Sequence, residues 1–329
     1  IMFTKIMKAK RRLLLFIGFV FVYACIFVFD NAKVSVGILN GPSCIPIVQM
    51  MDTDSENYSF VIYADPQGLL PKLLKNEVQI GFLPLNVAAK VYNSSNKKIK
   101  CIAITGTGNL SLITKNKTIK RLSQLNGKSV SIAGQGATPE YIFRFLLEKN
   151  NLSYTTEKKD NNSVLFDFSI PTANIVPALI SGKIDYAIVP EPFSTIATIK
   201  DESILVAIDL QQEFEDITKK GNTFPLTVLV ATKDFREKNS AAVQKFLAKY
   251  EKSYEWVVKN PAKAGKLCEE HDLGLAAGVV TKSIPKANYT FVNATDGKES
   301  CEELLTIFLE SEKSSIGGKL PDSGFYFEK

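Results

Sequence analysis

The sequence predicts an α/β protein built from two halves of like construction, and three observations lead to this prediction. Short apolar strands alternate with helical stretches from Lys33 onward, a pattern typical of strands joined by helices. In each half, a glycine-rich loop follows one strand and a proline ends another. The composition is 45% hydrophobic and 22% charged, which excludes disordered, collagen-like and coiled-coil proteins.

The N-terminus has the layout of an export signal. The uncharged apolar run Leu13–Phe29 follows a basic segment, and the basic side of such a signal stays cytoplasmic. Ala24 precedes Cys25 within the run, and this resembles the site at which bacterial lipoproteins are acylated. We therefore expect residues 1–32 to hold an extracytoplasmic protein at the bacterial cell membrane through a lipid on Cys25. An uncleaved anchor and a cleaved signal peptide are the alternatives.

Charge and histidine content narrow the function. The net charge is +6, and most of it comes from five basic residues at the start of the chain: Lys5, Lys8, Lys10, Arg11 and Arg12. Because the remainder is nearly neutral, we expect no nucleic-acid partner. His271 is the single histidine, so a His-rich metal site is excluded, and Ser-His-Asp or Cys-His catalysis would need that residue. The sequence has no P-loop motif, and we expect neither a metal nor a cofactor.

The cysteines after Cys25 do not form a recognisable motif. None of them has CxxC spacing: Cys44, Cys101, Cys268 and Cys301. A zinc or redox motif is therefore not predicted. Free buried thiols are the favoured interpretation. A disulfide between Cys268 and Cys301 is the alternative, because an exported protein meets oxidising conditions.

The first half is predicted from two strand-to-helix units. The strand Val34–Leu39 leads through the loop Asn40–Ser43 into a helix over Ile45–Met51. Further on, the segment Leu74–Val87 ends a helix, turns, runs one short strand and breaks at Pro84 into the next helix. Proline is suited to such a break because it lacks an N–H and fixes φ.

The second half repeats this order. The strand Ser129–Ala133 leads through the loop Gly134–Thr138 into the helix Pro139–Lys149, for which Thr138 is the expected N-cap. The segment Ile180–Phe193 then matches the proline-broken unit of the first half. Loops at the carboxyl ends of parallel strands line the ligand crevice of open sheets. The four loops are therefore predicted to meet at one cleft, with helix N–H groups directed into it.

Two further strands and one long helix complete the prediction. The strand Asn109–Thr114 is expected to cross into the second half, and Thr223–Ala231 is expected to return from it. The stretch Ala241–Val258 has apolar residues at helical spacing, which predicts a helix whose apolar side packs on the core. Those residues are Val243, Phe246, Leu247, Tyr250, Tyr254 and Val257.

These segments, in this order, resemble the extracytoplasmic solute-binding proteins of ABC importers, in the branch that contains sulfonate, nitrate, taurine and thiamine-pyrimidine binders. The matching segments are Val36–Pro42, Gly81–Ala88, Leu122–Lys128, Gly134–Tyr141, Ile184–Phe193 and Ser315–Asp322. The resemblance implies a two-lobed type II periplasmic-binding-protein fold with a central ligand cleft. One lobe would hold 33–113 and 224–329, and the other 114–223. It also implies a monomer that passes a small-molecule solute to a membrane permease driven by a cytosolic ATPase.

Two other classes of function stay open as alternatives. The resemblance extends to a fungal pyrimidine-synthesising enzyme and to dehydratases of menaquinone synthesis on the same fold. The fungal type uses an active-site histidine, whereas His271 lies in a charged helix end, far along the chain from the glycine-rich loops. We therefore expect a binding protein and not an enzyme. A surface interaction protein is the third class.

The expected ligand site gathers residues from all four loops. The predicted set is Asn40, Gly41, Ser43, Asn86, Gln135, Ala137, Thr138, Glu191 and Phe193. Gly41 and Ala137 are expected to offer backbone N–H groups, and Phe193 is expected to stack on a flat ligand. The loops contain no Arg or Lys, which strong anions usually recruit. Glu191 therefore favours a ligand with donors, such as an aminopyrimidine; the alternative is that Glu191 caps the following helix.

Overall fold

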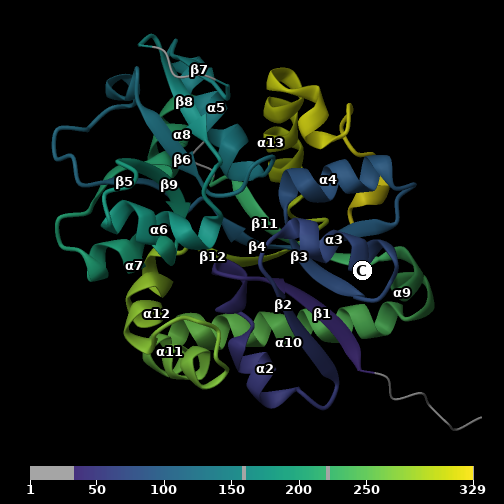
Figure 1. Cartoon of the computed structure of the whole chain (residues 1–329). Helices are drawn as coiled ribbons and strands as arrows, with labels where there is room; N and C mark the ends of the chain where they lie inside the picture. The colour runs from purple at the N-terminus through teal and green to yellow at the C-terminus, as the bar shows by residue number, and fades with distance from the viewer. Residues whose placement is uncertain (1–32, 158–160, 220–222, 329) are drawn as a thin grey trace, which may run out of the picture. The chain divides into compact units, whose positions relative to one another are not determined.

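The computed structural model describes residues 33–157, 161–219 and 223–328. These residues form two six-stranded mixed sheets with helices packed on their faces (Figure 1). The export signal and Cys25 lie outside the described residues. Within the described ranges, no helix has both the length and the apolar character that crossing a membrane requires.

The first sheet has the strand order β12-β4-β11-β3-β1-β2. Its strands are β1 (Val34–Leu39), β2 (Tyr58–Tyr63), β3 (Ile80–Pro84), β4 (Ile99–Thr107), β11 (Pro225–Thr232) and β12 (Tyr289–Asn293). The helices that follow these strands are η1 (Pro42–Cys44), α2 (Val48–Thr53), α3 (Pro66–Leu74), α4 (Leu85–Ser94), α9 (Lys233–Lys238), α10 (Ser240–Lys259), α11 (Pro261–Glu270), α12 (Ala277–Ser283), η3 (Ile284–Lys286), α13 (Lys298–Ser311), η4 (Lys313–Ile316) and η5 (Ser323–Phe325).

The second sheet has the strand order β10-β5-β9-β6-β8-β7. Its strands are β5 (Leu110–Thr114), β6 (Ser129–Ile132), β7 (Ser153–Thr155), β8 (Ser163–Asp167), β9 (Tyr186–Pro190) and β10 (Leu205–Asp209). Its helices are η2 (Leu122–Leu125), α5 (Thr138–Lys149), α6 (Thr172–Ile180), α7 (Phe193–Lys200) and α8 (Leu210–Thr218).

The two sheets repeat one arrangement, as the paired loops predict. In the first sheet β1 lies parallel to β2 and β3, and β11 runs antiparallel beside β3. In the second sheet β6 lies parallel to β8 and β9, and β5 runs antiparallel beside β9. The chain passes between the sheets twice, first from β4 to β5 and then from β10 through α8 to β11. In each sheet, the antiparallel strand named above is the first strand after such a passage.

The core consists of apolar residues on both faces of each sheet. Strands β3 and β9 are buried almost along their whole length, which explains their continuous apolar sequences. On one face of the first sheet α10 lies beside α2 and α11 (Figure 1). The predicted apolar side of α10 is buried there, including Val243, Phe246, Tyr250 and Val257.

Two helix starts differ from the prediction. The helix expected at Ile45 begins at Val48, after the short turn η1. Pro46 lacks an N–H and cannot donate a helical hydrogen bond. Helical bonding is seen after it, where Met51 N donates to Ile47 O at 3.0 Å. Helix α5 begins one residue earlier than expected, at Thr138, and Ala137 is its N-cap. The prediction of Thr138 as N-cap was therefore wrong.

The four described cysteines are buried and free. The favoured interpretation of buried thiols is confirmed, and the alternative disulfide between Cys268 and Cys301 is not formed. Burial raises the pKa of Cys44 to about 12 and that of Cys268 to about 12. These thiols act as small apolar side chains of the core.

Candidate functional site

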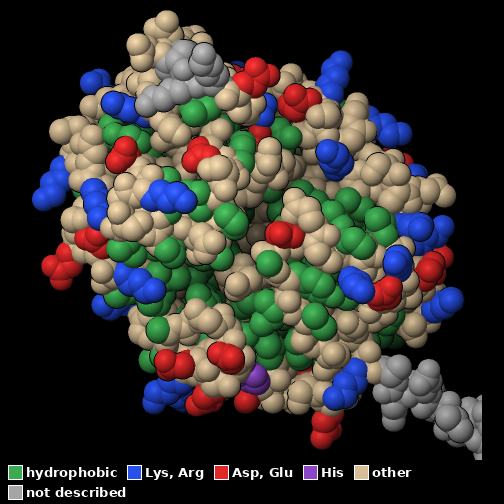
Figure 2. Space-filling view, viewed as in Figure 1, with side chains coloured by type: hydrophobic (Ala, Val, Ile, Leu, Met, Phe, Trp, Pro, Cys, Tyr) green, Lys and Arg blue, Asp and Glu red, His purple; other side chains and the backbone are tan. Residues whose placement is uncertain are grey.

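The loops at the carboxyl ends of β1, β3, β6 and β9 approach one another between the sheets. Parallel pairing places the ends of β1 and β3 on one edge of the first sheet, and the ends of β6 and β9 on one edge of the second. Two contacts then join the edges, each between a glycine-rich loop of one sheet and a proline-broken loop of the other. Figure 2 shows a narrow hollow near the middle of the view, at the place where Figure 1 labels β11.

The first contact joins Gly41 to Phe193. Gly41 has φ +101°, and a Cβ at this position would lie 3.0 Å from Cε2 of the Phe193 ring. Only glycine allows both this backbone conformation and this close approach. The half-buried Phe193 ring therefore packs against the loop that follows β1.

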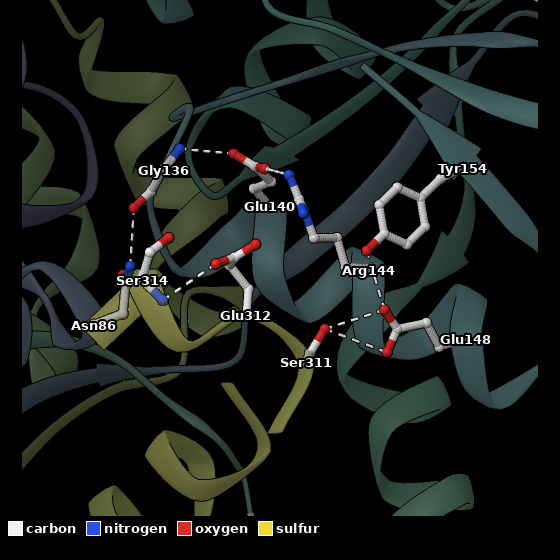
Figure 3. A network of polar contacts seen from close by, with 9 residues as sticks. All are labelled: Asn86, Gly136, Glu140, Arg144, Glu148, Tyr154, Ser311, Glu312 and Ser314. Carbon is white, nitrogen blue, oxygen red and sulfur yellow. Dashed lines mark hydrogen bonds and ion pairs between the residues drawn. The ribbon is translucent and has the colours of Figure 1, made fainter. Parts of the chain in front are cut away.

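The second contact joins Asn86 to the loop that follows β6. The Asn86 side chain is fully buried at the start of α4. Its Nδ2 donates to Gly136 O at 2.9 Å and to Ser315 O at 3.3 Å, while its Oδ1 accepts from Thr138 Oγ1 at 3.1 Å. This amide thus holds together α4, the second glycine-rich loop and the segment η4. Figure 3 shows the bond from Asn86 to Gly136.

The glycine-rich loop of the second sheet is also bonded to its own helix. Gly136 N donates to Glu140 Oε2 at 2.7 Å, and Glu140 Oε1 forms an ion pair with Arg144. The Arg144 guanidinium lies 5.1 Å from the ring centroid of Tyr154, a favourable cation–π geometry. Figure 3 shows that the network continues to Glu148, which accepts from Tyr154 and from Ser311 of α13.

Glu191 lies at the start of α7 and is 5% exposed. Its Oε2 accepts from Thr195 N at 3.3 Å, and its own N–H donates to Asn109 O at 3.3 Å. The peptide bond between Glu191 and Pro192 is cis. The carboxylate therefore contacts the first turn of α7, and its backbone is joined to the segment between β4 and β5.

The remaining predicted residues fall into two groups. Asn40 and Gln135 are exposed, whereas Ser43, Ala137 and Thr138 are buried. The Ala137 N–H donates to Gly134 O at 3.2 Å, so this donor is used within its own loop. Ser43 faces a small cavity in the first sheet.

That cavity has a volume of about 10 Å³ and lies behind the loop that follows β1. Its lining comes from three residues that follow Gly41 in the chain, from Asn109, from β3, β4, β11 and β12, and from α10. The lining residues are Pro42, Ser43, Pro46, Phe82, Thr105, Gly106, Asn109, Leu226, Thr227, Tyr250 and Tyr289.

Three buried polar atoms of residues that line this cavity make no hydrogen bond of good geometry with the described residues: Asn109 Oδ1, Tyr250 Oη and Tyr289 Oη. The polar neighbour of Tyr250 Oη is the Thr105 side chain. Sequence reasoning missed all three residues as site residues. The helical spacing of Tyr250 predicts core packing, and this residue is indeed fully buried. A tyrosine on an apolar helix face still needs a partner for its hydroxyl, and this was the available signal.

His271 does not belong to any of the four loops. His271 directly follows α11, and its Nε2 lies 3.5 Å from Asp52 Oδ1. Among the residues that the structure describes, no group of three or more His, Cys, Asp or Glu side chains is arranged to hold a metal ion.

Comparisons with solved structures identify the fold. An ABC transporter structure from Parabacteroides distasonis is 27% identical, with a TM-score of 0.74 over 90% of this chain and 99% of that chain. The periplasmic aliphatic sulphonate binding protein SsuA of Escherichia coli is 16% identical, with a TM-score of 0.66 over 85% of this chain and 92% of that chain. The periplasmic nitrate-binding protein NrtA of Synechocystis PCC 6803 is 11% identical, with a TM-score of 0.63 over 88% of this chain and 83% of that chain. The predicted two-lobed periplasmic-binding-protein fold is thus confirmed.

Sequence comparison identifies the family. No curated protein sequence matches the chain significantly. A family model described as NMT1/THI5 like matches residues 60–264, which is more than half of the chain. This range contains β3 and β9 and three of the four loops described above. The chain therefore belongs to the NMT1/THI5-like family.

Proposed function

We propose that the protein is the extracytoplasmic solute-binding component of an ABC importer. The observation that carries this proposal is the meeting of four strand-to-helix loops, two from each sheet, in the contacts of Gly41 with Phe193 and of Asn86 with Gly136. A solute held there would touch both sheets at once, so its binding would favour a closed arrangement. The similarity to the ABC transporter structure from P. distasonis, to the sulphonate-binding protein of E. coli and to the nitrate-binding protein of Synechocystis supports this proposal.

The proposed solute is a small heterocycle with an amino group, such as an aminopyrimidine. Glu191 is buried where the loops meet, and its carboxylate accepts from Thr195 N but has no cationic partner among the residues that the structure describes. An amino group would supply a second donor to this carboxylate, whereas a sulfonate or nitrate would be repelled by it. The solute would then pass to a membrane permease that a cytosolic ATPase drives.

Calorimetry with 4-amino-5-hydroxymethyl-2-methylpyrimidine tests this proposal. Glu191→Gln keeps the shape of the side chain and removes its charge. A charge-assisted hydrogen bond contributes roughly 1.5–3 kcal/mol, so the affinity should fall by about 10- to 150-fold. Affinity within twofold of the unsubstituted protein would assign Glu191 to capping of α7 and remove the support for an amino-bearing solute.

Asp209 offers a matched control for the capping role. Its carboxylate is the N-cap of α8 and accepts from Gln211 N and Gln212 N, so it stabilises a helix start as Glu191 does. It ends β10, which β5 separates from β9 in the second sheet, and it belongs to none of the four loops. Asp209→Asn should leave the affinity for the pyrimidine unchanged. A loss as large as that of Glu191→Gln would show that any weakened helix start reduces binding.

The proposed anchoring at the cell membrane is tested separately. Cys25 follows a small residue within the apolar N-terminal run. Labelled palmitate should be incorporated into the full-length protein in a bacterial host, and Cys25→Ala should abolish the label. Incorporation that survives this substitution would exclude lipidation at Cys25.

A further inference from the structure

The cavity behind the first glycine-rich loop contains polar atoms that the fold leaves unused. Tyr250 is fully buried, and Asn109 is 7% exposed. Asn109 Oδ1 and the Tyr289 hydroxyl have no hydrogen-bond partner among the described residues, and the Tyr250 hydroxyl, whose polar neighbour is Thr105, makes no hydrogen bond of good geometry with them. A buried polar atom without a partner is costly and rare in folded proteins. Such atoms on residues around one cavity therefore indicate a place for a polar group from outside the chain.

The orientation of Asn109 is set by the fold. Its Nδ2 donates to Ala287 O at 2.7 Å, so the amide nitrogen faces that carbonyl and Oδ1 faces the other way. A carbonyl oxygen can only accept, and the group that pairs with it must donate. Burial raises the pKa of Tyr250 and of Tyr289, and the carboxylate of Glu191 raises the pKa of Tyr289 further. Both hydroxyls therefore stay protonated and can donate or accept.

The lining also limits the size and charge of that group. Among the described residues, the side chains that line the cavity are all uncharged, so a charged group there would lose its hydration without gaining a counter-ion. A volume of about 10 Å³ accommodates a single group of the size of a water molecule. An uncharged amino or hydroxyl group fits these limits, whereas a sulfonate or nitrate does not.

The cavity lies next to the loops that carry the proposed function. Pro42 and Ser43, which line it, directly follow Gly41. On its other side, Asn109 O accepts from the N–H of Glu191. A solute held between the loops would therefore reach the cavity with one end.

We propose that Asn109, Tyr250 and Tyr289 form the inner subsite of the solute site and bind one uncharged amino or hydroxyl group at the end of the solute. This assignment rests on the proposed function as a solute-binding protein. It adds the residues that recognise one end of the solute and the chemical class of the group they take.

Calorimetry on three tyrosine-to-phenylalanine variants tests the subsite, with 4-amino-5-hydroxymethyl-2-methylpyrimidine, methanesulfonate and nitrate as probes at pH 8. Tyr250→Phe and Tyr289→Phe should each weaken binding of the pyrimidine by about 3- to 10-fold, as expected for a neutral hydrogen bond. Tyr326→Phe is the matched control, because Tyr326 is also buried with an unpartnered hydroxyl but lines a different pocket. It should stay within twofold.

Thermal unfolding of the free variants separates binding from folding. Removing an unpartnered buried hydroxyl should not lower the Tm of either Tyr250→Phe or Tyr289→Phe; a clear drop would show that the hydroxyl is satisfied within the protein and would overturn the assignment. Pyrimidine affinity within twofold in both variants, or binding of methanesulfonate or nitrate in place of the pyrimidine, would overturn the subsite while the solute-binding function stands. Absence of binding by all three probes would count against both.

Discussion

Asn86→Asp changes one atom of the side chain that joins α4 to the second glycine-rich loop. In the native protein Asn86 Nδ2 donates to two carbonyl oxygens, Gly136 O at 2.9 Å and Ser315 O at 3.3 Å. A carboxylate has no hydrogen to donate, so the substitution turns both attractions into repulsions. Of the three side-chain hydrogen bonds described above, the substituted residue would keep the one donated by Thr138 Oγ1.

The expected cost follows from the burial of this side chain, which is 0% exposed. Loss of two neutral hydrogen bonds and burial of an unpaired charge should lower the free energy of unfolding by roughly 3–5 kcal/mol near pH 7.5. Burial would raise the pKa of the new carboxyl above its unfolded value of about 4. The destabilisation should therefore grow as the pH rises from about 4 to that raised pKa, and stay constant above it.

Urea unfolding of Asn86→Asp and Asn93→Asp from pH 4 to pH 8 measures this effect. Asn93 lies on the same helix, and its Nδ2 also donates to two carbonyl oxygens, Ile316 O at 2.8 Å and Lys319 O at 2.7 Å. It is only partly buried, so solvent can hydrate the new charge and the cost should be about 1 kcal/mol. Equal losses in the two variants would refute the argument that the buried contact between the sheets is the stronger one.

Three further outcomes are expected. Gly41→Ala should lower the free energy of unfolding in urea by about 3 kcal/mol, because φ is +101° and the new Cβ would contact the Phe193 ring. Gly182→Ala is the control, with φ +74° and no atom within 4 Å of the new Cβ, and it should cost only about 1 kcal/mol. Equal costs would mean that the Phe193 ring moves aside freely. Iodoacetamide at pH 8 should label none of the four described cysteines before unfolding, because burial raises their pKa; rapid labelling of the folded protein would contradict this. The hydrogen bond from Lys97, with that from Tyr92, lowers the pKa of Asp322 to about 2. The ionised carboxylate therefore stabilises the fold above pH 4, and this contribution is lost as the pH falls towards 2. Asp322→Asn should make the free energy of unfolding depend less on pH between 4 and 2, and an unchanged dependence would rule out this contribution.

The sequence by itself predicted the local order of the fold. Apolar runs such as Ile80–Pro84 and Tyr186–Pro190 predicted buried strands, and the prolines at their ends predicted where the next helices begin. These features depend on neighbours along the chain, since strand burial, proline breaks and glycine loops are local restrictions on backbone shape. The ordered repetition of such units predicted the two sheets.

Only the tertiary structure decided which side chains meet. Thr138 has the sequence of an N-cap, yet its hydroxyl donates to Asn86, which lies 52 residues earlier in the chain. Tyr250 has the spacing of a core residue, yet it also lines a cavity together with Asn109 and Tyr289. A hydrogen bond forms only over about 3 Å and with a narrow range of angles. Residues distant in sequence reach that geometry only after both sheets have folded, which is why no local pattern specifies these partners.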